Sequence, residues 1–359
     1  MKYWCPVVLF FCLALGTPVT AQDDLTVGVA PAAPHYDSVR LQYIKTFPDH
    51  FFLWPVLKQR RLDFEMKDIN NRKTSLSYRS NKPYSFGLGM YLFELALEVT
   101  FAVPLNADTK RIYGESDARD LQLNVIGKKW GIDAYLQKYE GFYLDDPSVS
   151  IPANQPYPHR GDIETRNNGV SVNYTFNNKK FSFRSTYTFV DQQLRSAGSF
   201  LLYGTLSSFS AAGDSAILGE PYVKRFGEAA RIKSFRVTTL GVAPGYTYSL
   251  IYKGFFLNGT LAFGPAHNWL SSTHEDGVQK NDIKFNIYAA GRIALGYNGD
   301  RVFGGFTFMA QGKSAQFDNA QIVSSNTTFK MLIGYRFREF GFLKKRVWDL
   351  PKALMGGGL

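Results

Sequence analysis

The sequence predicts an all-β protein, an antiparallel transmembrane β-barrel of about 12–14 strands. Three observations lead to this fold class. Apolar and polar side chains alternate over many segments of about 8–15 residues, and successive side chains of a strand point to opposite faces. Aromatic residues make up 16% of the 359 residues. After residue 21 there is no run of about 18 apolar residues, so no membrane-spanning helix is expected.

The first residues have the features of a secretory signal peptide. Lys2 supplies the early positive charge, Val7–Leu15 is a short apolar core, and small residues around Ala21 form a cleavage pattern. Such an apolar core is too short to span a bilayer. We therefore expect residues 1–21 to direct export and then to be removed.

Charge and cysteine content narrow the function classes. Formal net charge is +11, and removing Lys2 leaves 40 basic and 30 acidic residues, or about +10. The basic residues are spread through turns and polar strand faces, without a basic helix or RNA-binding motif, so we expect no nucleic-acid partner. Cys5 and Cys12 both lie in the predicted signal peptide, so we expect no disulfide, no thiolate metal site and no cysteine nucleophile in the mature chain. No Rossmann glycine pattern is present either, and we expect no cofactor. The expected partners are outer-membrane lipid and the barrel-assembly machinery.

The chain divides into four parts. Residues 1–21 are the signal peptide, 22–49 a leader with a short ordered segment, 50–338 the barrel domain, and 339–359 a C-terminal tail. The expected strands of the barrel lie, in order, in His50–Lys67, Ser75–Arg79, Ser85–Leu92, Glu94–Val103, Asp120–Ile126, Trp130–Tyr139, Gly169–Thr175, Phe181–Phe189, Gly198–Ser210, Arg236–Leu250, Phe255–Phe263, Lys284–Tyr297, Val302–Ala310 and Thr328–Phe337.

Several of these strands are expected to pair through tight turns. Gly169–Val190 gives one hairpin, with Phe181, Phe183, Tyr187 and Phe189 marking its second strand. Ser75–Arg79 and Ser85–Leu92 flank a turn at residues 81–83, and 120–126 and 130–139 flank one at 127–129. Asn298-Gly299-Asp300 is a strong hairpin signal.

Long polar segments are expected to form loops, at Asn106–Arg119, Gly141–Arg166, Ala211–Ser234 and His267–Asp282. An even strand number places both chain ends in the periplasm, where turns are usually short. Counting back from the C-terminal strand then places Gly141–Arg166 on the periplasmic side. Either one strand is miscounted, or the barrel has a long periplasmic loop.

Charged residues on the polar strand faces should point into the lumen, because a charge facing lipid is costly. These lumen-lining candidates are Glu94, Glu98, Asp133, Arg184, Arg292, Lys330 and Arg336. They are compatible with a pore lining or binding cavity, but buried charges must pair or remain hydrated, which favours a structural ion network that fills a narrow barrel.

Three function classes remain open from the residues. The first is solute passage or binding, and the second is surface interaction through the loops. The third is an outer-membrane enzyme that acts on lipid, a hydrolase or acyl transferase, for which His267, Ser271, Ser272 and His274 are the one cluster worth naming. No paired-histidine or phosphate-loop motif is present, so we expect a non-enzymatic protein. A soluble secreted β-sandwich is the competing fold.

Motifs along the mature chain resemble one family. They are Trp130-x-x-Asp133-x-Tyr135-x-Gln137-x-Tyr139-x-Gly141-Phe142-Tyr143, Arg160-x-Asp162, Asn177-x-x-Lys180-Phe181-Ser182-Phe183-Arg184, Gln193-x-x-Ser196-Ala197-Gly198-Ser199, Pro244-Gly245-Tyr246, Gly296-Tyr297-Asn298 and Gly334-Tyr335-Arg336-Phe337. Their order resembles the bacterial family of unknown function DUF4421. The resemblance implies an envelope protein of the Gram-negative outer membrane, and it carries no known activity and no site residue.

Overall fold

The computed structural model describes residues 38–69, 75–92, 95–317 and 319–339, so the predicted signal peptide and nearly all of the predicted tail lie outside the described residues. The main sheet has 13 strands, and pairing of β15 (Ala320–Arg338) with β2 (His50–Asp68) closes it into an antiparallel barrel with a ten-strand ring. The predicted fold class is confirmed. No described helix is long and apolar enough to cross a bilayer.

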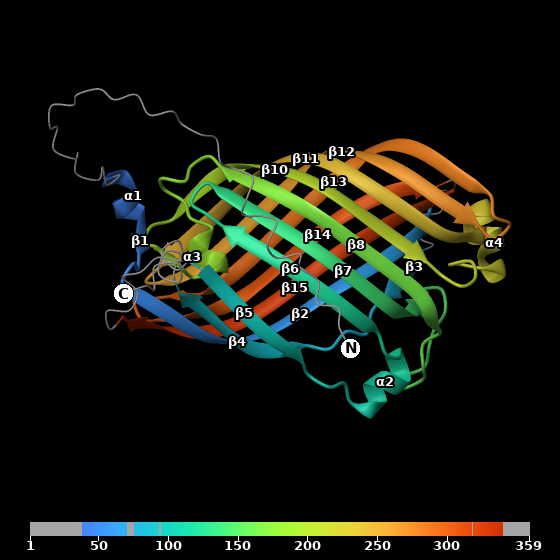
Figure 1. Ribbon diagram of the computed structural model, residues 1–359, viewed down its shortest axis with the longest axis horizontal. Coiled ribbons are helices and arrows are strands. Elements are labelled where there is room, and N and C mark those ends of the chain that lie inside the picture. Colours follow the sequence, from blue (N-terminus) through green and yellow to red (C-terminus); the bar gives the residue numbers. More distant parts are fainter. Residues whose placement is uncertain (1–37, 70–74, 93–94, 318, 340–359) are drawn as a thin grey trace, which may run out of the picture. The chain divides into compact units, whose positions relative to one another are not determined.

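One part of the barrel wall is continuous. Its strands are neighbours in the sequence and in space, and Figure 1 shows several of them side by side. They are β8 (His159–Thr175), β10 (Ala197–Ala212), β11 (Ile232–Tyr252), β12 (Phe255–His274), β13 (Gln279–Asn298), β14 (Val302–Phe317) and β15. Tight turns join β11 to β12 and β13 to β14, and the predicted turn after Asn298 is confirmed by a hydrogen bond from the Gly299 amide to the Val302 carbonyl, 3.0 Å.

The other part of the wall is split. It consists of β2, β3 (Ser75–Arg79), β4 (Ser85–Leu92), β5 (Leu95–Ala102), β6 (Asp117–Ile126) and β7 (Trp130–Asp145). β3 and β4 lie end to end along β2, so the predicted hairpin between them is wrong. β3 also pairs with β7 and so completes the ring. β4 pairs with β5 and β6 with β7, but within the described residues no backbone ladder joins β5 to β6.

The outward face of the barrel is apolar over part of its height. We call these outward side chains the apolar belt; they include Leu88, Phe101, Leu121, Ile132, Phe200, Leu202, Leu250, Leu261, Ile287, Ile293, Phe308 and Ile333. On β2 the outward face changes from Leu53 and Leu57 to Arg61, Asp63 and Glu65. β7 changes in the same way, to Lys138 and Glu140. An apolar band of limited height on longer strands is the surface of a bilayer-spanning barrel.

The second strand of the predicted hairpin at Gly169–Val190 is not a strand. β8 ends at Thr175, and the chain then turns inward through α3 (Arg184–Tyr187) to β9 (Asp191–Gln193). β9 pairs with β1 (Ile44–Thr46), which follows α1 (Ser38–Tyr43). Alternation failed as a guide because polar and aromatic residues of 181–187 are buried together inside the barrel, including Ser182, Ser185 and Thr186.

This correction also resolves the miscounted strand. Without a wall strand at 181–189, the loop of residues 146–158 lies at the end of the barrel opposite to the Asn298 turn. We call the end where β2 begins and β15 ends the lower end, and the opposite end the upper end. The predicted loop Gly141–Arg166 was too long at both sides, because β7 continues to Asp145 and β8 begins at His159.

Two other predicted loops differ from the structure. His267–Asp282 is almost entirely strand, since β12 runs to His274 and β13 starts at Gln279, which leaves only residues 275–278 as a connection. The segment Ala211–Ser234 is shortened to residues 213–231 and contains η1 (Glu220–Tyr222), α4 (Val223–Phe226) and η2 (Gly227–Arg231). Within Asn106–Arg119, α2 (Ala107–Tyr113) begins where the Asn106 side chain accepts the Thr109 amide, 2.7 Å.

Apolar cores fill both ends of the lumen. At the lower end, Phe181, Phe183 and Phe189 pack with inward residues of the wall such as Phe52 and Phe303. At the upper end, Phe226 and its neighbours on α4 and η2 pack among inward residues of the wall, for example Phe64 and Phe235. Figure 1 shows α3 and α4 at opposite ends of the barrel. Apolar clusters therefore occupy both ends of the lumen, with polar residues between them.

Candidate functional site

A charged cavity of about 460 Å³ lies between the two apolar cores. Of the predicted lumen residues, Glu98, Asp133, Arg292 and Lys330 line it together. Arg336 is buried lower down, where Nη2 donates to the Phe189 carbonyl and the Asn298 Oδ1. Arg184 belongs to α3, not to the wall, and lies 3.7 Å from Asp191. Glu94 lies outside the described residues.

One buried ion pair crosses the lumen. The Arg292 Nη2 on β13 donates to the Asp133 Oδ2 on β7 at 2.6 Å, and both side chains are almost fully buried. The rings of Tyr187 and Tyr203 lie 5.7 and 5.8 Å from the guanidinium carbon, within cation–π range. Alternation places both charges on the inward face of their strands. The pair joins the split wall to the continuous wall.

Glu98 is the centre of a second charged group. Its carboxylate accepts hydrogen bonds from Lys58 Nζ at 2.9 Å, Lys330 Nζ at 3.1 Å and Trp54 Nε1 at 3.3 Å. The three donors come from β2 and β15, whereas Glu98 lies on β5. One carboxylate thus holds two ammonium groups, which leaves one positive charge in excess.

Asp120 on β6 is the centre of a third group. Its oxygens accept hydrogen bonds from Arg60 at 3.1 Å, Lys82 at 3.3 Å and the Tyr139 hydroxyl at 3.2 Å. Here too a single carboxylate serves two cations. The three groups together contain Lys58, Arg60, Lys82, Arg292 and Lys330 against Glu98, Asp120 and Asp133, so the cationic charges outnumber the anionic ones.

The sequence reasoning missed part of this cavity. Lys58 and Arg60 were not named, although they continue the inward face of β2 that carries Trp54 and Val56. Asp120 was assigned to the boundary of a strand. Lys82, which donates to Asp120 without lining the cavity, was assigned to a turn. The inward face of β2 includes every second residue, so continuing from Val56 to positions 58 and 60 would have found Lys58 and Arg60.

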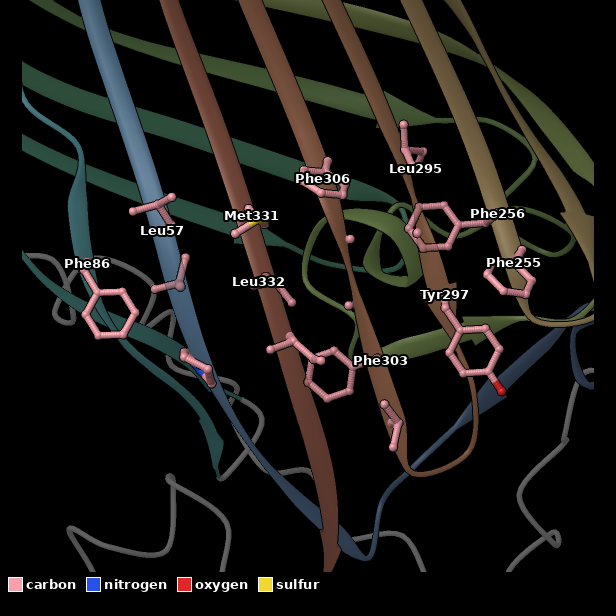
Figure 2. Close-up of a pocket in the computed structure, with 17 residues that line it drawn as sticks. Leu57, Phe86, Phe255, Phe256, Leu295, Tyr297, Phe303, Phe306, Met331 and Leu332 are labelled. Carbon is pink, nitrogen blue, oxygen red and sulfur yellow. The ribbon is translucent and has the colours of Figure 1, made fainter.

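A separate groove of about 690 Å³ runs over the outer surface of the belt. Figure 2 shows its residues coming from neighbouring strands, with Leu57 on β2, Met331 on β15, Phe306 on β14 and Phe255 on β12. The glycines Gly296, Gly304 and Gly305 contribute to its lining. A Cβ on Gly296 would collide with the Gly304 carbonyl oxygen, so close strand contact accounts for this glycine.

The proposed catalytic cluster does not converge. His267 lies on the outer face of β12, against the rings of Trp269 and Phe285 at 4.4 and 4.9 Å. His274 is buried on the inner face of the same strand. Ser271 and Ser272 likewise lie on opposite faces. A nucleophile and a base must be in contact, and these side chains are not arranged that way. Within the described residues, no group of three or more His, Cys, Asp or Glu is placed to hold a metal ion.

Comparison with solved structures finds outer-membrane proteins at low similarity. The outer membrane protease OmpT from Escherichia coli is 11% identical, with 82% of this chain and 98% of that chain covered and a TM-score of 0.39. The translocator domain of the autotransporter NalP from Neisseria meningitidis is 9% identical, covering 79% and 88%, with a TM-score of 0.31. The P. putida toluene transporter TodX is 8% identical, covering 82% and 91%, with a TM-score of 0.23.

At such similarity no residue role is transferred from these proteins. No curated protein matches the sequence. A family model does match, over residues 35–337, and its description is Domain of unknown function (DUF4421). This span includes the ring of the barrel up to the last residue but one of β15, and every charged group described above. The chain therefore belongs to the DUF4421 family, as the motifs predicted.

Proposed function

We propose that this protein is an integral outer-membrane barrel that binds a small anionic group inside a closed lumen. The apolar belt supports the membrane location, because such side chains on a barrel exterior are stabilised by lipid and destabilised by water. The predicted signal peptide supports export across the inner membrane. The closed ring disfavours the alternative of a soluble β-sandwich, because a sandwich consists of two separate sheets.

The charge count of the cavity is the single observation that carries the binding proposal. Four cations, Lys58, Arg60, Arg292 and Lys330, line the cavity together with three carboxylates, so the lining has one positive charge in excess. The cavity therefore attracts an anion with several acceptor oxygens, such as a phosphate, sulfate or carboxylate group. A hydroxyl on the wall also lacks a partner within the described residues: the Thr307 side chain is only 2% exposed, and its Oγ1 has no hydrogen bond. A bound anion would accept from such a donor.

The two apolar cores argue for binding rather than free passage. The lower core includes Phe181, Phe183 and Phe189 from the inward segment, and the upper core includes Phe226. Within the described residues, apolar side chains thus gather at each end, where an ion-conducting channel would need polar ones. The separation of His267 from His274 supports a non-enzymatic role and disfavours the lipid-acting enzyme.

Refolding into detergent and then into planar bilayers tests this proposal. We expect heat-modifiable migration on a gel, the absence of stable conductance steps, and saturable binding of inorganic phosphate or of a phosphate monoester by calorimetry. Replacing residues 181–189 with a flexible Gly-Ser linker removes the lower core and should produce conductance steps. Stable conductance from the unaltered protein would overturn the closed lumen, and absence of any anion binding would overturn the binding role.

A further inference from the structure

The cavity has a side wall with an opening, which we call the seam. The seam lies between β5 and β6, the two strands that no described backbone ladder joins. Above it, β3 closes the ring by pairing with β2 and β7. Residues of both edges line the charged cavity, including Leu97 and Val99 on β5 and Leu121 and Leu123 on β6. The cavity therefore reaches the outer surface between these strands.

The seam lies at the height of the apolar belt. Leu97 and Val99 are 58% and 61% exposed on the outer face of β5, and Leu121 and Leu123 are 68% and 61% exposed on β6. Leu121 and Leu123 are paired with Leu136 and Ala134 of β7, below the point where Lys138 begins the polar part of that strand. An opening at this height leads to the hydrocarbon of the bilayer and not to bulk water.

Unpaired strand edges are unfavourable in hydrocarbon, because their amide and carbonyl groups have no water to bind. Irregular backbone is tolerated at membrane depth where it lines a hydrated or polar cavity. The seam meets that condition, since Glu98 and Asp120 point from its two edges into the charged cavity. The structure therefore combines an apolar outer mouth with a cationic interior in one continuous space.

We propose that the seam admits an anionic lipid from the bilayer, with its headgroup in the charged cavity and its acyl chain left in the hydrocarbon. This inference rests on the proposed function and names the ligand class of the same cavity. The headgroup oxygens accept hydrogen bonds from cavity cations such as Lys58, Arg60 and Lys330. The chain lies between Val99 and Leu123 at the mouth. Entry through either end of the lumen crosses an apolar core, whereas entry through the seam does not.

Binding can be followed by tryptophan fluorescence, because Trp54 lines the cavity and donates to Glu98. In the mature chain, replacing Trp130, Trp269 and Trp348 with Phe leaves Trp54 as the single reporter. The protein is placed in phosphatidylcholine vesicles and titrated with lysophosphatidic acid. We expect a saturable change in Trp54 fluorescence, and at least a ten-fold weaker response to lysophosphatidylcholine, whose headgroup has no net charge. An equal response to the two lysolipids would overturn the assignment of an anionic headgroup.

Closing the seam tests the route. Val99→Cys with Leu123→Cys places one thiol on each edge, and a bifunctional maleimide then bridges them. The matched control is Leu257→Cys with Leu295→Cys, which bridges two outward residues directly opposite each other on the paired strands β12 and β13. We expect the seam bridge to abolish the response to lysophosphatidic acid and the control bridge to leave it unchanged. An unchanged response after the seam bridge would overturn the lateral route.

Removing cavity cations tests the headgroup site. Lys58→Gln with Lys330→Gln should weaken lysophosphatidic acid binding at least ten-fold, while Lys138→Gln with Arg166→Gln removes the same charge from the outer face and should leave it unchanged. Heat-modifiable migration of each variant checks that the barrel has formed. Binding of inorganic phosphate that survives the seam bridge would keep the proposed function and reject the lipid. If neither phosphate nor lysophosphatidic acid binds the folded barrel, both proposals fail together.

Discussion

The continuous wall and the split wall of this barrel are held together in different ways. From β10 to β15 each strand pairs with the next over most of its length, and the strands are 16 to 21 residues long. Between the long strands β2 and β7 the wall is divided among shorter strands, with β3 and β5 only 5 and 8 residues long. Backbone hydrogen bonds dominate the first region, and side-chain ion pairs supplement them in the second.

The two walls also differ in the contacts that hold their strands, and this difference is clearest at β5 and β6 on the two sides of the seam. β5 is tied to β2 and β15 through Glu98, and β6 is tied to β2 through Asp120. A backbone ladder is satisfied in itself, whereas these carboxylates depend on cations that also face a cavity. An anion that enters the cavity therefore competes with the contacts that hold the seam. We therefore expect the split wall to be the region of this barrel that responds to an anion bound in the cavity.

The largest expected effect comes from the ion pair that joins the two walls. Asp133→Leu leaves the buried Arg292 guanidinium without its carboxylate, so we expect a loss of about 3–5 kcal/mol in the free energy of unfolding. The double variant Asp133→Leu with Arg292→Met removes both charges and should recover most of that loss. Urea unfolding of the refolded barrel in vesicles measures both. Equal losses for the single and double variants would show that the pair contributes through its shape and not its charge.

A charge placed on the belt of the continuous wall should have the next largest effect. Leu261→Arg puts a guanidinium on the lipid-facing side of β12, and we expect a loss of about 2–4 kcal/mol together with poor membrane assembly. Ser271→Arg is the matched control, since it lies on the same face of the same strand, beyond the belt. It should assemble normally. Similar behaviour of the two variants would contradict the position of the belt.

Close strand contact in the continuous wall gives a smaller effect. A Cβ at Gly296 would collide with the backbone of β14, so Gly296→Ala should destabilise the barrel by about 1–3 kcal/mol. Gly204 on β10 has no heavy atom within 4 Å of the corresponding position, so Gly204→Ala should be close to neutral. The same unfolding titration distinguishes them. If both changes were neutral, the backbones of β13 and β14 would have moved apart to accept the added Cβ, which would contradict the expected cost of their close approach.

Much of the wall was predictable, because strand alternation in a membrane barrel is set by lipid outside and polar side chains inside. Alternation named Glu98 on β5, Asp133 on β7 and Arg292 on β13 as lumen candidates for this reason, and all three line the cavity. The segment 181–189 was misread since its aromatic residues are spaced as in a strand, while their burial comes from the lumen and not from a wall. The seam could not be predicted from the sequence, because alternation identifies a strand but does not show which strand it pairs with.

The smallest expected effect belongs to the upper core, where β3 of the split wall meets the segment that fills the lumen. The Tyr78 hydroxyl donates to the Ile217 carbonyl at 2.6 Å, and its ring stacks on Phe64 at 4.6 Å. Tyr78→Phe removes the hydrogen bond and keeps the stacking, so we expect a loss of about 1 kcal/mol, by the same unfolding titration. Arg160 also donates to the Ile217 carbonyl, at 2.7 Å, which leaves that oxygen partly satisfied and keeps the cost low. A loss several times larger would mean that β3 depends on this contact to close the ring, and the split wall would then be weakest above the seam.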